Sequence, residues 1–286
     1  MADIENKIKR MSLLGIDLEH TGSKLKIVKV QRDVKSLVVP EGIVELESLS
    51  SLCGLEKVIL PSTLYKIGDG VFRGCTQLEQ LELPEHLALI GSRAFEGCIK
   101  LVEIKLSSNL KKLGDRVFSD CVNLKKVKFP NKEVILGTGL FDGCRSLTEI
   151  NLPDRCKVIK EYTFRGCTNL EQVEIPRKCL EIEGCAFFNS GIKKIVLPYK
   201  TTKIGVLAFS NCRQLEEVYI LGNISTLKMG VFESCIKLKH IELPKTLAEI
   251  GIVAFKNCTN LESIDFPRDI TVVESSAFSG CKKLKI

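Results

Sequence analysis

Apolar residues recur along this chain at a nearly constant spacing, and phenylalanine marks that spacing most clearly. Ten phenylalanines share one phase of the pattern: Phe72, Phe95, Phe118, Phe141, Phe164, Phe187, Phe209, Phe232, Phe255 and Phe278. Neighbouring members lie 23 residues apart, except that Phe187 and Phe209 lie 22 apart. A fixed period of this length is typical of a solenoid, in which each repeat forms one coil that packs on its neighbours.

One half of each repeat predicts a short β-strand. In the segment from Leu78 to Pro84, Leu81 and Leu83 alternate with polar residues, which turns one row of side chains inward and the other outward. The closing proline cannot extend a hydrogen-bonded ladder. Because each coil returns the chain in the same direction, the strands of successive coils are expected to pair in parallel.

The other half of the repeat carries the chain back. We expect the segment from Leu87 to Ile90 to form a short extended piece, which Gly91 ends with a turn. Ala94 to Cys98 is expected to form about one helical turn, with Phe95 filling the interior. The pattern therefore predicts an α/β repeat solenoid, a right-handed leucine-rich-repeat coil with a parallel β-sheet on one face and short strands or helical turns on the other.

Residues 1–33 do not fit the repeat. Ile4, Ile8 and Met11 have helical spacing, and residues 24–30 alternate as a strand does. A solenoid must cover the open end of its core, so this segment is expected to be an N-terminal cap.

Residues 34–286 are expected to form the solenoid itself, of about eleven coils and without a separate second domain. The chain stops at Ile286 in the middle of a strand. An uncapped end exposes core, so truncation, fraying and end-to-end pairing of two molecules are the alternatives.

Nine of the 13 cysteines stand three residues after a repeat phenylalanine: Cys75, Cys98, Cys121, Cys144, Cys167, Cys212, Cys235, Cys258 and Cys281. Each has equivalent neighbours above and below rather than one unique partner, so we expect a column of buried free thiols in place of disulfides. The absence of a Cys-x-x-Cys pair argues against metal. With no signal-peptide core at the N-terminus, the chain as written is expected to be cytoplasmic, or at the cell surface if a leader was removed.

The formal net charge of +7 is unevenly spread. Residues 67–98 carry two basic and five acidic groups, a net of −3, whereas residues 100–134 carry nine basic and four acidic groups, a net of +5. Nucleic-acid binders show a continuous basic stripe, so nucleic acid is an improbable partner. The apolar runs are too short to span a membrane.

The chain lacks recognisable catalytic chemistry. Its three histidines (His20, His86 and His240) lie far apart in the repeat, and no phosphate loop, Ser/His/Asp set or metal-ligand cluster is recognisable. We therefore expect no enzyme activity and no cofactor.

The full repeat reads Leu-x-x-Ile-x-Leu-Pro-x-x-Leu-x-x-Ile-Gly-x-x-Ala-Phe-x-x-Cys, and Leu238 to Cys258 reproduces every defined position. This pattern resembles the BspA-like leucine-rich repeat family over roughly residues 34–286. The resemblance implies a right-handed leucine-rich-repeat solenoid whose known members are mostly adhesins or host-protein binders. It implies no shared catalytic residues.

The outward strand residues vary from coil to coil, so any binding function is expected there. The candidate partner-binding residues are Lys105, Lys126, Lys128, Glu149, Asn151, Glu174, Val196, Glu217, Tyr219, His240 and Glu242. We predict a non-enzymatic protein-binding scaffold that uses this face, with Tyr219 beside Val196 as an aromatic anchor. The alternatives are a surface adhesin that binds host proteins and a polyanion binder that uses the Lys105–Lys128 patch.

Three departures from the repeat stand out. Ser107 and Leu221 replace the closing proline, and Met229-Gly230-Val231 alters a turn. Between Phe187 and Ile192 one residue is missing, and Ser190 stands where the column cysteine is expected. The segment from residue 188 to 230 is thus either a local kink or a site adapted to a partner.

Overall fold

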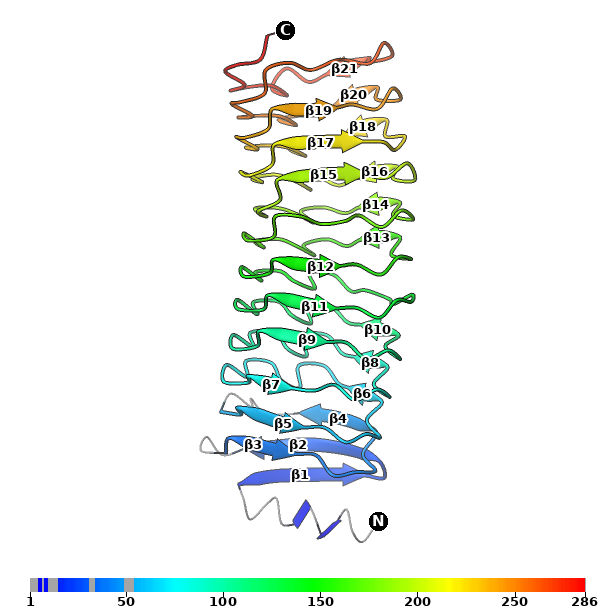
Figure 1. The fold of residues 1–286 in the computed structure, drawn as a ribbon, viewed down its shortest axis with the longest axis vertical. Coiled ribbons are helices and arrows are strands. Elements are labelled where there is room, and N and C mark those ends of the chain that lie inside the picture. The colour runs from blue at the N-terminus through cyan, green and yellow to red at the C-terminus, as the bar shows by residue number, and fades with distance from the viewer. Residues whose placement is uncertain (1–4, 7, 10–14, 31–33, 49–53, 286) are drawn as a thin grey trace. The chain divides into compact units, whose positions relative to one another are not determined.

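The computed structural model of the chain describes residues 5–6, 8–9, 15–30, 34–48 and 54–285. They belong to two compact units, Met1–Cys144 and Arg145–Ile286. Both units consist of turns of a parallel β-solenoid, about ten over the described residues, whereas the sequence pattern suggested about eleven (Figure 1). The predicted parallel pairing of successive coils is confirmed in both units.

One side of each unit carries strands of two to four residues, whose exposed side chains are here called the strand face. In the first unit these strands are β3 (Ser36–Val38), β5 (Lys57–Ile59), β7 (Gln80–Leu81), β9 (Glu103–Lys105) and β11 (Lys126–Lys128). In the second unit they are β12 (Glu149–Asn151), β15 (Lys194–Leu197), β17 (Glu217–Ile220) and β19 (His240–Glu242). The alternating burial of β15 confirms the predicted inward and outward rows, since Ile195 and Leu197 are buried whereas Lys194 and Val196 are exposed.

The other side, here called the return side, carries mostly two-residue strands. In the first unit these are β4 (Glu45–Ser48), β6 (Lys66–Ile67), β8 (Leu89–Ile90) and β10 (Lys112–Leu113). In the second unit they are β13 (Val158–Ile159), β14 (Glu181–Ile182), β16 (Lys203–Ile204), β18 (Thr226–Leu227), β20 (Glu249–Ile250) and β21 (Val272–Val273). The extended piece expected to end at Ile90 is therefore confirmed as β8.

An antiparallel hairpin precedes the repeats. It consists of β1 (Ile16–Thr21) and β2 (Lys24–Val30), and β2 pairs in parallel with β4. The sequence predicted β2 correctly but missed β1. Residues 5–6 and 8–9 are helical, whereas Ile4 and Met11 lie outside the described residues. The hairpin occupies the edge of its sheet, where a cap is expected, and its capping role stays a prediction.

Stacked phenylalanine rings fill the interior of each unit, as the sequence predicted. In the first unit the Phe72 and Phe95 ring centroids lie 5.4 Å apart and the Phe95 and Phe118 centroids 5.6 Å apart. In the second unit Phe187 and Phe209 are stacked at 5.1 Å, despite the shorter repeat between them. Each such ring buries a large apolar area.

The helical turn expected from Ala94 to Cys98, and with it the α/β class, is not confirmed. Alternate amides in this segment bond to the next coil: Phe95 N–H donates to the Val117 carbonyl at 2.9 Å, while Cys98 N–H donates back to the Phe95 carbonyl at 3.2 Å. An α-helix would need every amide to bond four residues back along its own coil. A run of tight turns forms instead, with Arg93 at φ 56° and Gly97 at φ 73°. Outside residues 5–6 and 8–9, no described residue is helical.

The predicted cysteine column is confirmed: eight of its nine members are buried and Cys281 is partly exposed. The thiols also form hydrogen bonds between coils, which the sequence did not predict. Each of the thiols of Cys98, Cys121 and Cys235 donates a hydrogen bond to the backbone carbonyl of the phenylalanine in the preceding coil, over 3.2, 3.0 and 3.1 Å. Burial raises the pKa of Cys98 to about 12, which keeps the thiol protonated.

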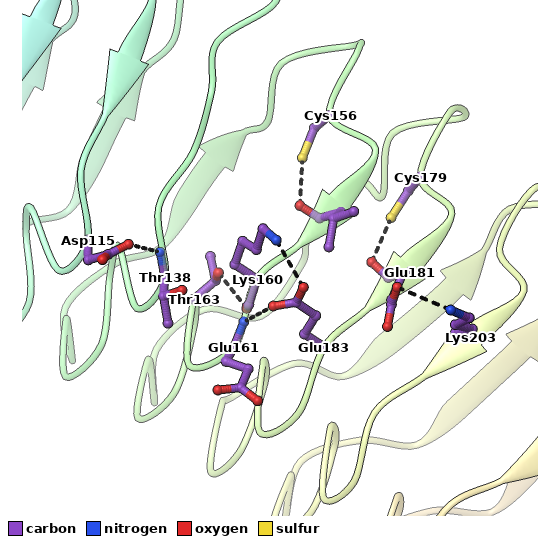
Figure 2. A network of polar contacts seen from close by, with 11 residues as sticks. Asp115, Thr138, Cys156, Lys160, Glu161, Thr163, Cys179, Glu181, Glu183 and Lys203 are labelled. Atoms are coloured by element: carbon purple, nitrogen blue, oxygen red, sulfur yellow. Dashed lines mark hydrogen bonds and ion pairs between the residues drawn. The ribbon is translucent and has the colours of Figure 1, made fainter.

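Close approach of coils depends on a glycine four residues before the phenylalanine. A Cβ atom at Gly114 would lie 2.5 Å from the Ser92 backbone nitrogen. In the second unit Lys160 and Glu183 replace this glycine, and Lys160 Nζ lies 3.0 Å from Glu183 Oε1 (Figure 2). Glu183 also accepts a 3.0 Å hydrogen bond from the Glu161 amide. Charged partners on adjacent coils thus replace a close backbone contact.

Candidate functional site

The described residues form neither a recognisable metal site nor a membrane-spanning helix. They contain no group of three or more His, Cys, Asp or Glu side chains that could hold a metal ion. None of the described segments forms a helix long and apolar enough to cross a membrane. The candidate site residues lie on the exposed strand face.

The basic patch of the first unit is partly neutralised by its own carboxylates. Register places Lys128 beside Lys105 and Lys126 beside Glu103 on β9 and β11. Lys128 Nζ lies 3.1 Å from Glu103 Oε1, although both side chains are more than half exposed. Exposed pairs of this kind contribute little stability, but they reduce the field that the patch presents to an anion.

In the second unit, strand register brings most of the predicted residues into two rows. Val196, Tyr219 and Glu242 form one row across β15, β17 and β19. The row beside it contains Glu217 and His240, together with Lys194. The predicted neighbourhood of Tyr219 and Val196 is therefore correct.

Tyr219 is already engaged within the face. Lys194 Nζ lies 4.6 Å from its ring centroid, and the His240 ring centroid lies 5.6 Å away. The phenol donates a 3.2 Å hydrogen bond to Glu217, which also pairs with Lys194 at 2.8 Å. Hydrogen bonding from Lys194 is the main reason that the pKa of Glu217 lies below its ordinary value. Tyr219 thus anchors a polar cluster, and its ring is less available to a partner than the sequence suggested.

Ladder pairing on the strand face of the second unit is interrupted between β12 and β15. Residues 171–176 match the repeat consensus, yet none of them is in a strand (Figure 1). Lys193 N–H donates to the Glu171 carbonyl at 3.0 Å, but no backbone hydrogen bond joins the described segments 172–175 and 194–197 beyond it. Val173 is half-buried, whereas the equivalent Ile150, Ile195 and Val218 are fully buried. A similar loss of strand pairing occurs at residues 263–266.

The missing residue of the shorter repeat lies in the turn that leads into β15. Gly191 stands in this turn, and a Cβ atom there would clash with the Thr168 carbonyl oxygen of the preceding coil. The Gly191 amide donates to the Cys167 carbonyl at 3.0 Å. The shortened turn is therefore pressed onto the coil before it, and the ladder opens directly after this contact.

An apolar cleft lies at the opening and has a volume of about 810 Å³. Its apolar lining consists of Val173, Ile175, Val196, Pro198, Tyr199 and Leu221. Tyr199 is 76% exposed, and Val196 is 40% exposed. Leu221 stands where other coils have the closing proline, and its amide donates to the Leu197 carbonyl at 3.0 Å, which a proline could not do.

A second, polar cleft adjoins the apolar one, with Gln172, Glu174 and Lys193 lining both. It has a volume of about 1060 Å³. Its carboxylates are Glu149, Glu171, Glu174 and Glu216, and its two lysines are Lys193 and Lys237. Lys193 pairs with Glu171 at 2.7 Å, so a net negative charge remains.

The predicted site residues of the second unit therefore gather around these clefts. Glu149 and Asn151 line the polar cleft, Val196 lines the apolar cleft, and Glu174 lines both. Glu217, Tyr219, His240 and Glu242 lie on the adjoining strands. Lys105, Lys126 and Lys128 belong to the first unit.

Sequence reasoning missed Tyr199, Arg177 and Lys200, which line the apolar cleft. One signal was present in the repeat. The position directly after the closing proline is polar or charged in the neighbouring coils, as in Asp154, Arg177 and Lys245, but it is aromatic at Tyr199. An aromatic residue at a position that is otherwise solvated indicates a contact surface.

The repeat pattern matches a known protein family. A sequence profile described as "BspA type Leucine rich repeat region (6 copies)" matches residues 44–171 and 157–285. The chain belongs to the BspA-type leucine-rich repeat family. Repeat proteins of this family typically act as binding or adhesin scaffolds, and no catalytic residues are associated with the BspA-type repeat. A search of curated proteins gives no match.

Several solved structures share the BspA-type fold. A leucine-rich repeat protein from Bacteroides ovatus is 26% identical, with a TM-score of 0.76 over 94% of this chain and 86% of that one. A leucine-rich cell surface protein from Faecalibacterium prausnitzii is 21% identical, with a TM-score of 0.61 over 95% and 86%. The pneumococcal vaccine antigen PcpA is 20% identical, with a TM-score of 0.56 over 94% and 84%. The latter two likenesses concern the fold alone.

Proposed function

We propose that this chain is a non-enzymatic scaffold that binds a protein partner through the strand face of its second unit. The observation that carries the proposal is the opening between residues 172–175 and 194–197, where a regular repeat would close the sheet. At the opening, half-buried Val173 lies with exposed Val196 and Tyr199 on a face whose other outward side chains are mostly charged. Exposed apolar surface with a polar rim is a common mark of a protein-interaction site.

Two features favour a protein partner over a polyanion. The Lys105–Lys128 patch is opposed by Glu103, which lies 3.1 Å from Lys128. The polar cleft of the second unit carries more carboxylates than lysines. A polyanion needs a continuous basic track, and binding through a short patch would be weak and sensitive to salt.

The adhesin alternative draws on the family and on two relatives whose names describe a cell surface protein and a vaccine antigen. At 21% and 20% identity, those relatives share the fold, and their roles do not transfer to this chain. An adhesin would also be a protein-binding scaffold, so the proposed binding face applies to both readings.

The test is selection of binders followed by two matched variants. Phage-displayed random peptides of about twelve residues are selected on the purified chain, and their affinities are measured for Val196→Glu and Ile252→Glu. Both substitutions place a carboxylate at an exposed apolar residue: Val196 is 40% exposed on the strand face, and Ile252 is 50% exposed on the return side. We expect Val196→Glu to weaken most selected peptides by about tenfold or more, and Ile252→Glu to change affinity by less than about twofold.

Peptides that lose affinity for Ile252→Glu but not for Val196→Glu would move the binding surface to the return side. Peptides that are insensitive to Val196→Glu would also contradict the proposal.

A further inference from the structure

Building on the proposed function, we infer that the apolar cleft binds an extended segment of a partner protein through apolar side chains flanked by acidic residues. The inference specifies the partner chemistry, and it can fail while the strand face still binds proteins by another mode.

The shape of the apolar cleft suits a large apolar side chain. The cleft of about 810 Å³ has six apolar lining residues, including Val173, which is half-buried here and would be covered in a closed coil. A cleft of this size accommodates one or two large side chains with their backbone. An apolar anchor that fills it would remove from water the surface that the opened ladder exposes.

The backbone beside the cleft suits an extended partner segment. Since segments 172–175 and 194–197 do not bond to each other, their facing backbone groups are not used in a ladder. Extended peptides commonly bind at such unpaired strand segments, where main-chain hydrogen bonds supply affinity and side-chain pockets supply selectivity. This favours an extended partner segment over a helix.

The charged residues around the cleft favour an acidic partner. Four basic residues and one acidic residue line the apolar cleft: Arg177, Lys193, Lys194 and Lys200 against Glu174. Lys193 and Lys194 are balanced by Glu171 and Glu217, at 2.7 and 2.8 Å. Arg177 and Lys200 are exposed and form no ion pair with any described residue. These two cations favour acidic residues on the partner beside Tyr199.

The probe is a fluorescently labelled synthetic peptide of about eight residues, with Leu-Phe at its centre and Asp and Glu around it. Two comparison peptides differ in one feature each. The first replaces Leu-Phe with Ser-Asn, and the second replaces the acidic residues with lysine. Affinities are measured by fluorescence anisotropy on the full chain. We expect each comparison peptide to bind about tenfold more weakly than the acidic apolar peptide.

Charge reversal at the cleft separates specific binding from loss of folding. In the double variant Arg177→Glu with Lys200→Glu, the acidic peptide should lose about tenfold in affinity, while the lysine peptide should gain. A gain in binding requires a folded cleft. The control variant is Lys245→Glu with Arg268→Glu. These two exposed residues also follow closing prolines, but they do not line the cleft. The control should leave both affinities unchanged.

Three outcomes would overturn the inference: equal binding of the Leu-Phe and Ser-Asn peptides, an unchanged charge preference after reversal, or an equal effect of the control variant. If the phage-selected peptides still depend on Val196 in that case, the proposed function stands and only the partner chemistry is wrong.

Discussion

The thiol of Cys235 donates a 3.1 Å hydrogen bond to the backbone carbonyl of Phe209, one coil earlier in the chain. The same carbonyl accepts the Cys212 amide at 3.3 Å. The cysteine therefore links adjacent coils and also packs as a small buried apolar side chain. This double role explains why the repeat uses cysteine where alanine or valine would also be apolar.

We expect Cys235→Ala to lower the free energy of unfolding by about 1–2 kcal/mol, because it removes one hydrogen bond and leaves a small cavity. Cys235→Val fills the space but cannot donate, so it should also destabilise the chain, whereas Cys235→Ser keeps the donor. Urea unfolding followed by circular dichroism measures all three variants.

The control for the cysteine series is Cys185→Ser, since Cys185 is partly exposed and lies outside the column. Its free energy of unfolding should stay within about 0.5 kcal/mol of the parent. If Cys235→Val is as stable as the parent, the thiol hydrogen bond contributes nothing measurable.

Alkaline pH should destabilise the chain through its buried thiols. Burial raises the pKa of both Cys98 and Cys212 to about 12, from an ordinary value of 9.0. Unfolded thiols lose protons as the pH passes about 9, while folded thiols keep them until about 12, so stability falls across that window and thiols have no effect below it. Each such thiol contributes a slope of up to about 1.4 kcal/mol per pH unit.

The measurement is urea unfolding from about pH 8 to about pH 10, under reducing conditions. Lysines and tyrosines titrate in the same range, so the control is Cys98→Ser, which should show a shallower loss of stability. An identical slope in the parent and in Cys98→Ser would exclude the thiol contribution.

Gly191→Ala should destabilise the second unit by about 1–3 kcal/mol, since its Cβ would meet the Thr168 carbonyl and force the shortened turn away. Gly184→Ala is the matched control, because the nearest atom to its Cβ would be 3.4 Å away. Thermal unfolding distinguishes them. Equal melting temperatures for the two variants would mean that the turn is not pressed onto its neighbour.

Val253 has φ 53°, a left-handed conformation that a branched side chain rarely adopts. Val253→Asn should therefore raise the free energy of unfolding by about 0.5–1 kcal/mol, because asparagine tolerates this conformation. The converse test is Gly74→Val, where φ is 70° and no atom lies within 4 Å of the new Cβ. It should cost about 1–2 kcal/mol. A loss of stability in Val253→Asn would show that packing of the valine outweighs its backbone strain.

The features that every coil must repeat were already evident from the amino-acid pattern. Interior packing imposes the same demand on each coil, so Phe95 and Cys98 recur at a fixed phase and reveal the period, the inward rows and the parallel strands. The missing residue before Ile192 could likewise be located by counting, because a solenoid tolerates few changes of length.

The hydrogen bonds between coils, by contrast, could be seen only in the folded chain. The amide of Phe95 bonds to Val117 in the next coil, so turns replace the expected helix, and no local preference within one repeat reveals this choice. Residues 171–176 match the strand consensus but lie in no strand, and the apolar cleft combines Val173, Tyr199 and Leu221 from three coils. Pairing depends on the position of a neighbouring backbone, which is a property of two coils together and is absent from the sequence of either one.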